Sequence, residues 1–517
     1  ELHERTPSEQ TGFETQQHVH RQRQQSPLVN GPIINTAQPS DIAVIGMSGR
    51  FPGANNLDEY WSNLDLGQDC ISEIPPERWR WQDHFDSDPN SEGKTYSKWG
   101  GFISELETFD AAFFRMFPRE AEALDPQQRL LLESTWSCLE NAAYTPEQLS
   151  HASTGVYVGA SYNHYRDYQV GPLLDAYTGL GNHNAILANR LSYFLNINGP
   201  CMTVDTLCAS SLVAVHLAVR ALRSGECKQA LAAGVHAGLS PWYYQSLSRL
   251  RALSPDGRCK TFDSEANGYV PGEGVGVVLL KPLSQALKDR DHICGVIKGT
   301  AVNHGGQSSG LTVPNSSAQT QVIRSALSDA NISADTISYV ETHGTGTSLG
   351  DPIETRALTN AFKQDSSRQG YCAIGSVKSQ IGHLEPAAGI AGLIKVMLAF
   401  KAKRIPASLH VNTPNPECEF IDSPFYVNTR STEWPVNESS PRRAGVSSFG
   451  LGGVNAHAIL EQAPERLIKQ DNTAPKGCVL TLSAHSAHSL KALINAYSTL
   501  PPSTFEQIND LCFTASV

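Results

Sequence analysis

The 517-residue sequence lacks the features of several specialised protein classes. Forty Lys and Arg residues against 51 Asp and Glu give a formal net charge of −11, so it lacks the basic excess typical of proteins that bind nucleic acid or anionic membranes. The longest apolar stretch, around Gly389 to Phe400, is too short to span a bilayer and contains Lys395. The N-terminus lacks the pattern of a secretory signal. We therefore expect neither a nucleic-acid nor a membrane partner.

The eleven cysteines also lack any pattern that would indicate a metal site or a disulfide framework. They include no C-x-x-C pair and show no regular spacing, which argues against zinc and against paired cysteines. The histidines form no H-x-x-x-H pair on a plausible metal-binding helix. The odd number of cysteines fits a reducing compartment, so we expect a cytoplasmic protein without a bound metal.

The sequence divides into three segments. Residues 1–40 are rich in Gln, His, Ser and Pro, which predicts a poorly ordered N-terminal linker. Residues 41–463 alternate β-rich runs with helical segments such as PQQRLLLESTWSCLENA, residues 126–142, which predicts an α/β fold with a largely buried sheet. Residues 464–517 begin with a polar stretch and continue as strand, turn and helix, as expected of a linker followed by the truncated start of a small α/β domain. Because the chain opens without Met, we interpret it as a piece of a larger polypeptide.

A cysteine lies where a predicted strand gives way to a predicted helix, in VDTLCASSLVAVHLA. Residues 202–206 are typical of a strand, and a helical spacing follows at Leu212, Val215, Val219 and Leu222, ending at Ser224 and Gly225. This places Cys208 in or near the first turn, where the helix dipole favours a thiolate by about 0.3–1 kcal/mol. Such a small effect means that a reactive Cys208 needs a histidine or a desolvated site as well. The alternative is a small buried core residue.

A second stretch, ISYVETHGTGTSLGDPIE, predicts a strand, a Gly/Thr loop and a helix. Asp351 as N-cap, Pro352 at the first position and Glu354 three residues on predict where that helix begins. His343 lies at the end of the strand, where polar groups of an α/β sheet commonly face a ligand. The alternative is a structural histidine, although the flanking glycines would let a ligand approach the backbone.

A third stretch, GSVKSQIGHLEPAAGIAG, carries Lys378 and His383 in a loop before a helix rich in Ala and Gly that could pack closely against a neighbour. Lys378 and Glu385 are expected to form a buried ion pair beside the histidine, the alternative being a solvated surface pair. Strand, turn and small-residue helix occur both here and at Cys208, which suggests a duplication.

Two glycine-rich stretches remain. In SSFGLGGVNAHAIL, glycines 450, 452 and 453 could expose backbone N–H groups as an oxyanion hole, or could form a tight hairpin. GYVPGEGVGVVLL lacks both the Walker lysine and the G-x-G-x-x-G spacing, so its glycines indicate sheet packing rather than phosphate binding.

Taken together, DTLCASS, VETHGTGTSLGDPIE, GSVKSQIGHLE and SFGLGGVNAH resemble the β-ketoacyl synthase (ketosynthase) domain of modular type I polyketide synthases, from Asp41 to Ala463. GYVPGEG, NHGG and LTVPN most resemble ketosynthases of trans-acyltransferase assembly lines. The resemblance implies the thiolase fold, in which two similar halves form five α/β/α/β/α layers, usually as a homodimer.

The resemblance also implies a role for each site residue. Cys208 would be the nucleophile, and His343 and His383 would assist decarboxylation. Lys378 would support His383, together with Glu385. The backbone N–H groups of Cys208 and Leu451 would form an oxyanion hole. Thr345 and Thr347 would bind the pantetheine arm. The domain itself would bind no metal and no cofactor, because substrates arrive on the phosphopantetheine arms of acyl carrier proteins.

The implied activity is a decarboxylative Claisen condensation that extends a polyketide by two carbons. The partners would be acyl carrier protein domains and other domains of the same synthase. Alternatives are a non-condensing acyl-transfer relay and a catalytically silent dimer scaffold. A hydrolase is disfavoured because no Asp or Asn is evidently placed to orient a histidine. The acyl specificity and the capacity for condensation depend on positions near the site where the sequence departs from the family pattern. These positions are Leu207, Ala209, Gln380, Leu451 and Val454.

Overall fold

The computed structural model describes residues 41–168, 176–436, 440–465, 478–501 and 508–516. The predicted linker of residues 1–40 lies outside these ranges, as does most of the polar stretch after residue 464. Strands and helices alternate along the chain as the sequence predicts, and α3 (Pro126–Ala142) has the predicted bounds.

The main sheet has 11 strands in the order β12-β10-β9-β14-β15-β8-β1-β7-β6-β4-β5. In chain order they are β1 (Ile42–Arg50), β4 (Thr154–Gly159), β5 (Cys201–Val204), β6 (Gln229–His236), β7 (Gly274–Pro282), β8 (Gly295–His304), β9 (Tyr339–Glu341), β10 (Cys372–Gly375), β12 (Phe425–Val427), β14 (Arg443–Phe449) and β15 (Val454–Gln462). The two small sheets pair β2 (Ile71–Glu73) with β3 (Trp99–Gly101) and β11 (Arg404–Ile405) with β13 (Thr432–Glu433).

The sheet is built from two halves with the same topology. In the first half, β1, β7 and β6 are antiparallel neighbours, and β4 and β5 then continue in parallel. In the second half, β8, β15 and β14 are antiparallel, and β9 and β10 continue in parallel. A short antiparallel pairing of β1 with β8 joins the halves. The repeat suggested by the sequence is therefore present as a repeated strand order.

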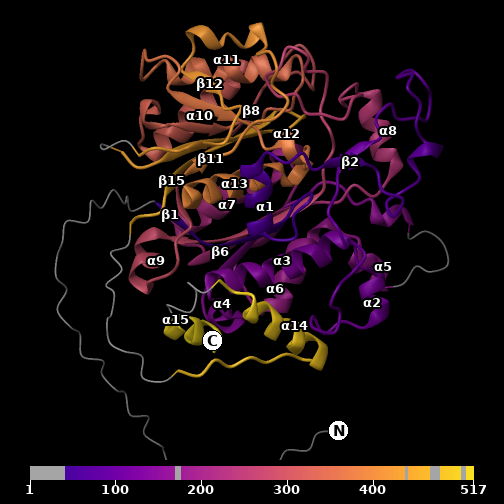
Figure 1. The fold of residues 1–517 in the computed structure, drawn as a ribbon, viewed down its shortest axis with the longest axis vertical. Helices are drawn as coiled ribbons and strands as arrows, with labels where there is room; N and C mark the ends of the chain where they lie inside the picture. Colours follow the sequence, from indigo (N-terminus) through magenta and orange to yellow (C-terminus); the bar gives the residue numbers. More distant parts are fainter. Residues whose placement is uncertain (1–40, 169–175, 437–439, 466–477, 502–507, 517) are drawn as a thin grey trace, which may run out of the picture. The chain divides into compact units, whose positions relative to one another are not determined.

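Helices on both sides of each half complete five layers (Figure 1). α3 and α6 (Asn184–Leu195) contribute to one apolar core with the first half of the sheet. α10 (Ser316–Ala330) and α11 (Gly350–Phe362) contribute to another with the second half. Between the halves lie α7 (Ser210–Ser224) and α13 (Ala388–Ala402), packed in a core that includes strands of both. This arrangement confirms the thiolase fold.

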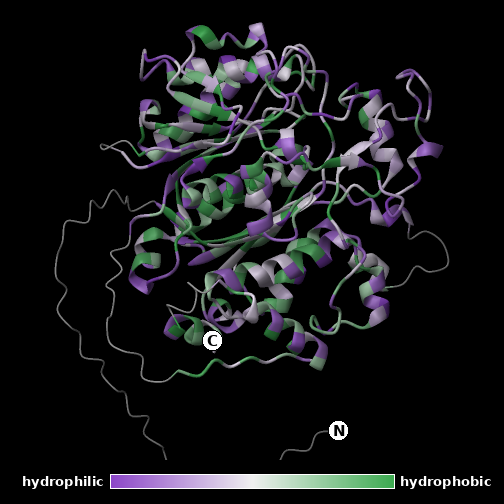
Figure 2. Ribbon diagram, viewed as in Figure 1, coloured by the Kyte–Doolittle hydropathy of each residue, from purple (hydrophilic) through white to green (hydrophobic). Residues whose placement is uncertain are grey.

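The two central helices are strongly apolar (Figure 2). The stretch Leu207–Ser224 has the length and hydropathy of a membrane span, but 67% of it is buried inside the protein, as for a core helix. A Cβ on Gly389 would lie 2.8 Å from Cβ of Leu212, so α13 packs directly against α7 at this point. The first turns of the two helices contact each other, and this meeting of two N-termini locates the site described below.

Two predictions about local structure are wrong. α11 begins at Gly350, and Leu349 occupies the N-cap position without a side-chain cap hydrogen bond. Asp351 does not cap the helix, because its carboxylate accepts the backbone N–H groups of Phe262 and Gly346. Residues 478–484 form no strand, since they pair with no described strand. The helix predicted after it is present as α14 (Ala487–Ser498), and α15 (Ile508–Thr514) follows.

The remaining α-helices are short. They are α1 (Leu57–Leu66), α2 (Pro118–Ala123), α4 (Pro146–Ser150), α5 (Ala176–Gly181), α8 (Pro241–Arg249), α9 (Leu283–Asp289) and α12 (Lys378–Ile381).

Candidate active site

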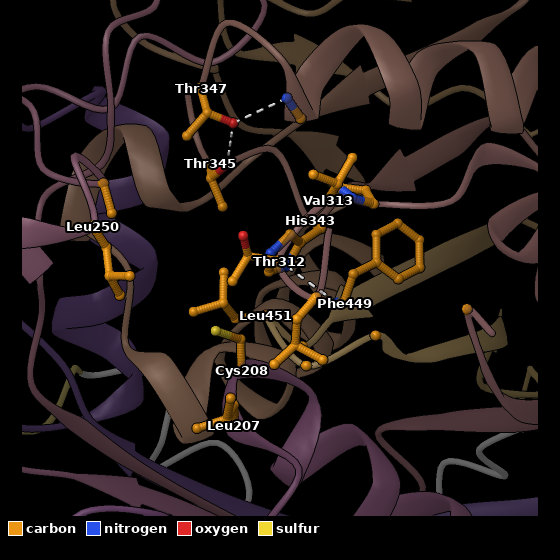
Figure 3. A pocket seen from close by; sticks show the side chains of 18 of the residues that line it. Leu207, Cys208, Leu250, Thr312, Val313, His343, Thr345, Thr347, Phe449 and Leu451 are labelled. Carbon is orange, nitrogen blue, oxygen red and sulfur yellow. Dashed lines mark hydrogen bonds between the residues drawn. The ribbon is translucent and has the colours of Figure 1, made fainter. Parts of the chain in front are cut away.

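A cavity of about 730 Å³ lies over the N-terminal ends of α7 and α13. Among its lining residues are most of those singled out from the sequence, although they come from both halves of the chain (Figure 3). These are Cys208, His343, Thr345, Thr347, His383, Glu385 and Leu451. Lys378 is buried and does not line the cavity.

Cys208 lies in a 3₁₀ turn, Leu207–Ala209, that leads directly into α7. The preceding Leu207 has a φ of 54°, a left-handed conformation that costs a non-glycine residue about 1–3 kcal/mol and is found mainly at functional sites. Cys208 is only 8% exposed, and its thiol donates to Oε2 of Glu385 at 3.4 Å. The turn therefore directs the thiol toward the second half of the protein.

The pKa of Cys208 is raised well above its ordinary value, chiefly by burial and then by the charge of Glu385. Desolvation outweighs the small effect by which the helix N-terminus was expected to favour a thiolate. A hydrogen bond from the backbone N–H of Leu451 acts in the opposite direction but does not reverse the shift. Cys208 is therefore a thiol at neutral pH.

Both histidines are held as neutral hydrogen-bond donors. The backbone N–H of Glu385 donates to Nδ1 of His383 at 2.9 Å, and the backbone N–H of Phe449 donates to Nδ1 of His343 at 3.3 Å. An Nδ1 that accepts a hydrogen bond carries no proton, so in both rings the hydrogen is on Nε2. Burial, and then Lys378, lowers the pKa of both histidines well below the ordinary value. The ring centroids are 5.4 Å apart.

Buried polar groups fix the loop that carries His343. The carboxylate of Glu354 accepts the backbone N–H groups of His343 and Gly344, both at 2.7 Å. Nζ of Lys378 donates to the carbonyl oxygen of His343 at 2.5 Å. Burial raises the pKa of Glu354 to about 7 and that of Asp351 to about 6. The sequence indicated Glu354 only as a helix-start residue, and its bond to the His343 loop was not predicted.

Lys378 and Glu385 are both buried, as expected, but each has partners other than those predicted. Lys378 holds the backbone of His343, and burial lowers its pKa. Glu385 contacts Cys208 through one oxygen and the hydroxyl of Tyr269 through the other, at 2.8 Å. These contacts take the place of the predicted ion pair between Lys378 and Glu385.

The glycine-rich loop after β14 is a tight hairpin that also faces the cysteine. The N–H of Gly453 donates to the carbonyl of Gly450 at 2.9 Å, which closes the turn into β15. A Cβ on Gly450 would lie 2.4 Å from the carbonyl oxygen of Thr206, so only glycine allows the hairpin to approach the turn of Cys208 this closely. The backbone N–H of Leu451 points to the thiol, and its side chain, 42% exposed, lines the cavity.

The two threonines lie on another wall of the cavity (Figure 3). Their Oγ1 atoms are 3.1 Å apart, and Oγ1 of Thr347 accepts the backbone N–H of Gly350 at 3.2 Å. The polar edge of this wall therefore comes from the loop that also carries His343.

The GYVPGEG stretch contributes more than the predicted packing of glycines. The N–H of His383 donates to the carbonyl of Val270 at 2.7 Å, and the N–H of Gly272 donates to the carbonyl of His383 at 2.8 Å. Tyr269 bonds to Glu385, and its ring centroid lies 5.0 Å from that of His383. No signal in the sequence indicated Tyr269, because its partner is 116 residues away.

Three of the departures from the family pattern, at Ala209, Gln380 and Val454, lie outside the cavity lining. Gln380 is buried, and its Nε2 donates to the carbonyls of Leu64 and Ala407 at 3.2 and 3.4 Å. Ala209 is fully buried. This leaves Leu207 and Leu451 as the departures that contact its volume.

The thiol, His383 and Glu385 place potential metal-ligand atoms within 4.8 Å of one another. The hydrogen-bonding of His383 argues against a metal site here, since its Nδ1 accepts an amide hydrogen and its Nε2 carries a proton. Without a free imidazole lone pair, the set does not match a three-ligand zinc centre.

Comparison with known proteins gives matches along the described chain. Residues 39–286 match the family profile described as "Beta-ketoacyl synthase, N-terminal domain", residues 294–412 that of "Beta-ketoacyl synthase, C-terminal domain", and residues 414–514 that of "Ketoacyl-synthetase C-terminal extension".

Among curated proteins, polyketide synthase PksL of Bacillus subtilis is 46% identical over 478 residues, which are 89% of this chain and 10% of PksL. Polyketide synthase ThaG of Burkholderia thailandensis is 49% identical over 423 residues, which are 81% of this chain and 8% of ThaG. The chain thus spans about a tenth of the length of these relatives.

Two solved ketosynthase structures resemble this chain closely in fold. The oxazolomycin ketosynthase domain OzmH KS7 from Streptomyces albus JA3453 is 43% identical with a TM-score of 0.82, and the match covers 87% of this chain and 79% of that one. The ketosynthase from module 6 of the Bacillus subtilis bacillaene synthase is 40% identical with a TM-score of 0.81, and the match covers 92% of this chain and 80% of that one.

Proposed function

The chain belongs to the β-ketoacyl synthase family, and on that premise we propose that it joins an acyl chain held on Cys208 to a malonyl group carried by an acyl carrier protein, in a decarboxylative Claisen condensation. The product is a polyketide chain longer by two carbons. The observation that carries this proposal is the pair of neutral Nε2–H donors, on His343 and His383, in one cavity with the thiol of Cys208.

The first step transfers the acyl chain from a carrier thioester to Sγ of Cys208. A tetrahedral intermediate forms, and its oxyanion needs hydrogen-bond donors where the charge develops. The backbone N–H groups of Cys208 and Leu451 are proposed for this role, supported by the approach of the Leu451 N–H to the thiol.

The second step removes carbon dioxide from the malonyl thioester. Loss of carboxylate leaves an enolate, and Nε2–H donors from His343 and His383 to the thioester oxygen stabilise its negative charge. Neutral imidazoles suit this role because no proton has to be abstracted. The enolate carbon then attacks the acyl thioester, a C–C bond forms, and the Sγ–C bond breaks to release Cys208 as a thiolate, which takes up one proton from solvent.

The substrates supply the rest of the chemistry. Ketosynthase domains use no cofactor of their own, because acyl groups are carried on the phosphopantetheine arm of acyl carrier proteins. The hydroxyls of Thr345 and Thr347 are proposed to hydrogen-bond to the amides of that arm, which supports placing the arm along their wall of the cavity.

We also propose that the domain works as a homodimer. β5 lies at the end of the main sheet and, among the described strands, pairs only with β4. Met202 on this strand is 41% exposed and Tyr193 on the neighbouring α6 is 87% exposed. An exposed edge strand beside apolar side chains favours pairing with a second copy.

The wider setting is proposed from the relatives and the sequence. Acyl carrier proteins and other domains of the same synthase would be the partners, in a trans-acyltransferase assembly line. The eleven free cysteines fit the cytoplasm. We keep the division into a linker before residue 41, a ketosynthase domain to residue 463 and a following linker.

The test supplies the protein with acyl-loaded and malonyl-loaded carrier proteins and measures carbon dioxide and β-ketoacyl thioester by mass spectrometry. We expect both products, dependent on Cys208, His343 and His383. Acylation of Cys208 without carbon dioxide above a no-enzyme control, across several acyl groups, would establish the relay instead. No acylation would leave only the scaffold.

A further inference from the structure

We propose that Glu385 is a catalytic residue that accepts the thiol proton of Cys208 during acyl loading, an inference that rests on the proposed function. The need for such a group follows from burial of the thiol. Cys208 is 8% exposed and is a thiol at neutral pH, whereas only a thiolate attacks a thioester effectively. A group in contact with Sγ must therefore take the proton as the new bond forms.

Neither histidine can accept this proton as the site is built. Nδ1 of His383 is occupied by the N–H of Glu385, and Nδ1 of His343 by the N–H of Phe449. The Nε2 atoms of both rings already carry hydrogen. Lys378 is engaged with the carbonyl oxygen of His343 and not with the thiol.

Glu385 is in direct contact with the reacting atom. Its Oε2 lies 3.4 Å from Sγ of Cys208, within the range of a hydrogen bond from a thiol. Its Oε1 accepts the hydroxyl of Tyr269 at 2.8 Å, which orients the carboxylate toward the sulfur. Tyr269 therefore acts as a positioning residue, and it gives the GYVPGEG stretch a part in the chemistry.

The backbone of Glu385 supports a functional role for its side chain. Its φ is 48°, so it lies in the left-handed region that costs a non-glycine residue about 1–3 kcal/mol. This conformation places the carboxylate over the cavity while the N–H of the same residue holds His383. One residue thus sets the tautomer of the histidine and contacts the nucleophile.

The electrostatics fit a proton acceptor. Burial raises the pKa of Glu385, and the hydrogen bonds from Tyr269, Tyr243 and Cys208 together with the charge of Lys378 oppose that rise. The carboxylate and the thiol are in direct contact, so the proton has a direct path from Sγ to Oε2. Transfer from sulfur to oxygen keeps the total charge of the pair constant.

The proton is accounted for throughout the step. The S–H bond of Cys208 breaks as its proton passes to Oε2 of Glu385, while the electron pair on sulfur forms the S–C bond to the acyl carbon. The bond from that carbon to the carrier sulfur then breaks. The departing carrier thiolate takes the proton from Glu385, which returns to the carboxylate without any external base.

The experiment follows single-turnover loading of an acyl N-acetylcysteamine thioester by intact-protein mass spectrometry, in H₂O and in D₂O. Glu385→Gln keeps the shape of the side chain but cannot accept a proton. We expect it to slow loading at least about 10²-fold, the usual contribution of a general base. The native protein should load more slowly in D₂O than in H₂O, whereas Glu385→Gln should load at the same rate in both solvents. Glu385→Asp should keep the solvent effect, and the exposed Glu92→Gln should load as the native protein does.

Condensation by the preloaded protein separates this inference from the proposed function. Glu385→Gln that has been acylated by prolonged incubation is then given malonyl carrier protein, and its loss of carbon dioxide release should be smaller than its loss of loading rate. The inference is overturned if Glu385→Gln loads within twofold of the native protein, if it keeps the solvent effect, or if condensation by the preloaded variant falls by as large a factor as loading. A native protein that loads with the solvent effect but releases no carbon dioxide overturns the proposed function and leaves the role of Glu385 standing.

Discussion

Leu207 and Glu385 occupy equivalent positions in the two halves of the protein. Each begins a three-residue 3₁₀ turn, with φ of 54° and 48°, and each turn leads into a helix of 15 residues, α7 or α13. The two turns contact each other. The duplicated backbone therefore brings two strained turns face to face, and one turn carries a thiol while the other carries a carboxylate.

The first prediction concerns the nucleophile. Cys208→Ala should abolish acyl loading, because among the eleven cysteines Cys208 is the one that lines the large cavity. Intact-protein mass spectrometry with an acyl thioester measures this directly. Cys478→Ala, which alters an exposed thiol, is the matched control and should load fully. Residual loading of Cys208→Ala at the native rate would assign the acyl group to another residue.

The second prediction separates loading from decarboxylation. His343→Ala and His383→Ala each remove one Nε2–H donor, and loss of one preorganised donor costs about 10²–10³ in rate at comparable sites. Carbon dioxide release should fall by that factor, whereas acylation of Cys208 should continue. Buried His457, which bonds to Ser447 and does not line the cavity, provides a control in His457→Gln. A histidine variant that condenses at the native rate would remove that residue from the mechanism.

The third prediction concerns the shape of the entrance. Leu451 is 42% exposed in the wall of the cavity beside Cys208, so Leu451→Phe adds bulk next to the thioester. Loading of branched or bulky acyl groups should slow more than loading of acetyl. Rates across a panel of acyl sizes measure the preference. If the preference is unchanged, the side chain of Leu451 does not restrict the path of the acyl group.

The fourth prediction concerns the pH dependence of stability. Burial raises the pKa of Glu354 from its ordinary 4.5 to about 7, so between these values the native protein binds a proton that the unfolded chain does not. The proton bound by Glu354 in the native protein stabilises the fold at low pH. This contribution to the free energy of unfolding is lost as the pH rises through about 7. The difference corresponds to about 3 kcal/mol in the free energy of unfolding.

Urea unfolding at a series of pH values tests this. The free energy of unfolding of the native protein should decrease from about pH 4.5 to about pH 7, and Glu354→Gln should lose that part of the slope. Glu92→Gln, at an exposed position, should keep it. An identical slope in Glu354→Gln and the native protein would mean that Glu354 does not titrate in this range.

The sequence by itself determined the order of the elements and indicated the residues of the candidate site. The strand before Cys208, the helix after it and its end at Gly225 follow from spacing and from residue conformational preference, which are local properties. The bounds of α3 were predicted for the same reason. Repetition of strand, turn and small-residue helix was enough to suggest the duplication.

Tertiary structure alone decided the partners of the polar groups and the direction of the Cys208 pKa shift. Glu385 contacts a thiol 177 residues away and Tyr269 116 residues away, and such contacts depend on how the two halves pack rather than on any spacing along the chain. The sequence indicated a helix dipole that would favour a thiolate, but burial between the two halves of the protein opposes it with a larger cost. Desolvation is a property of the assembled core, so no local pattern could predict that Cys208 would remain a thiol in contact with a carboxylate.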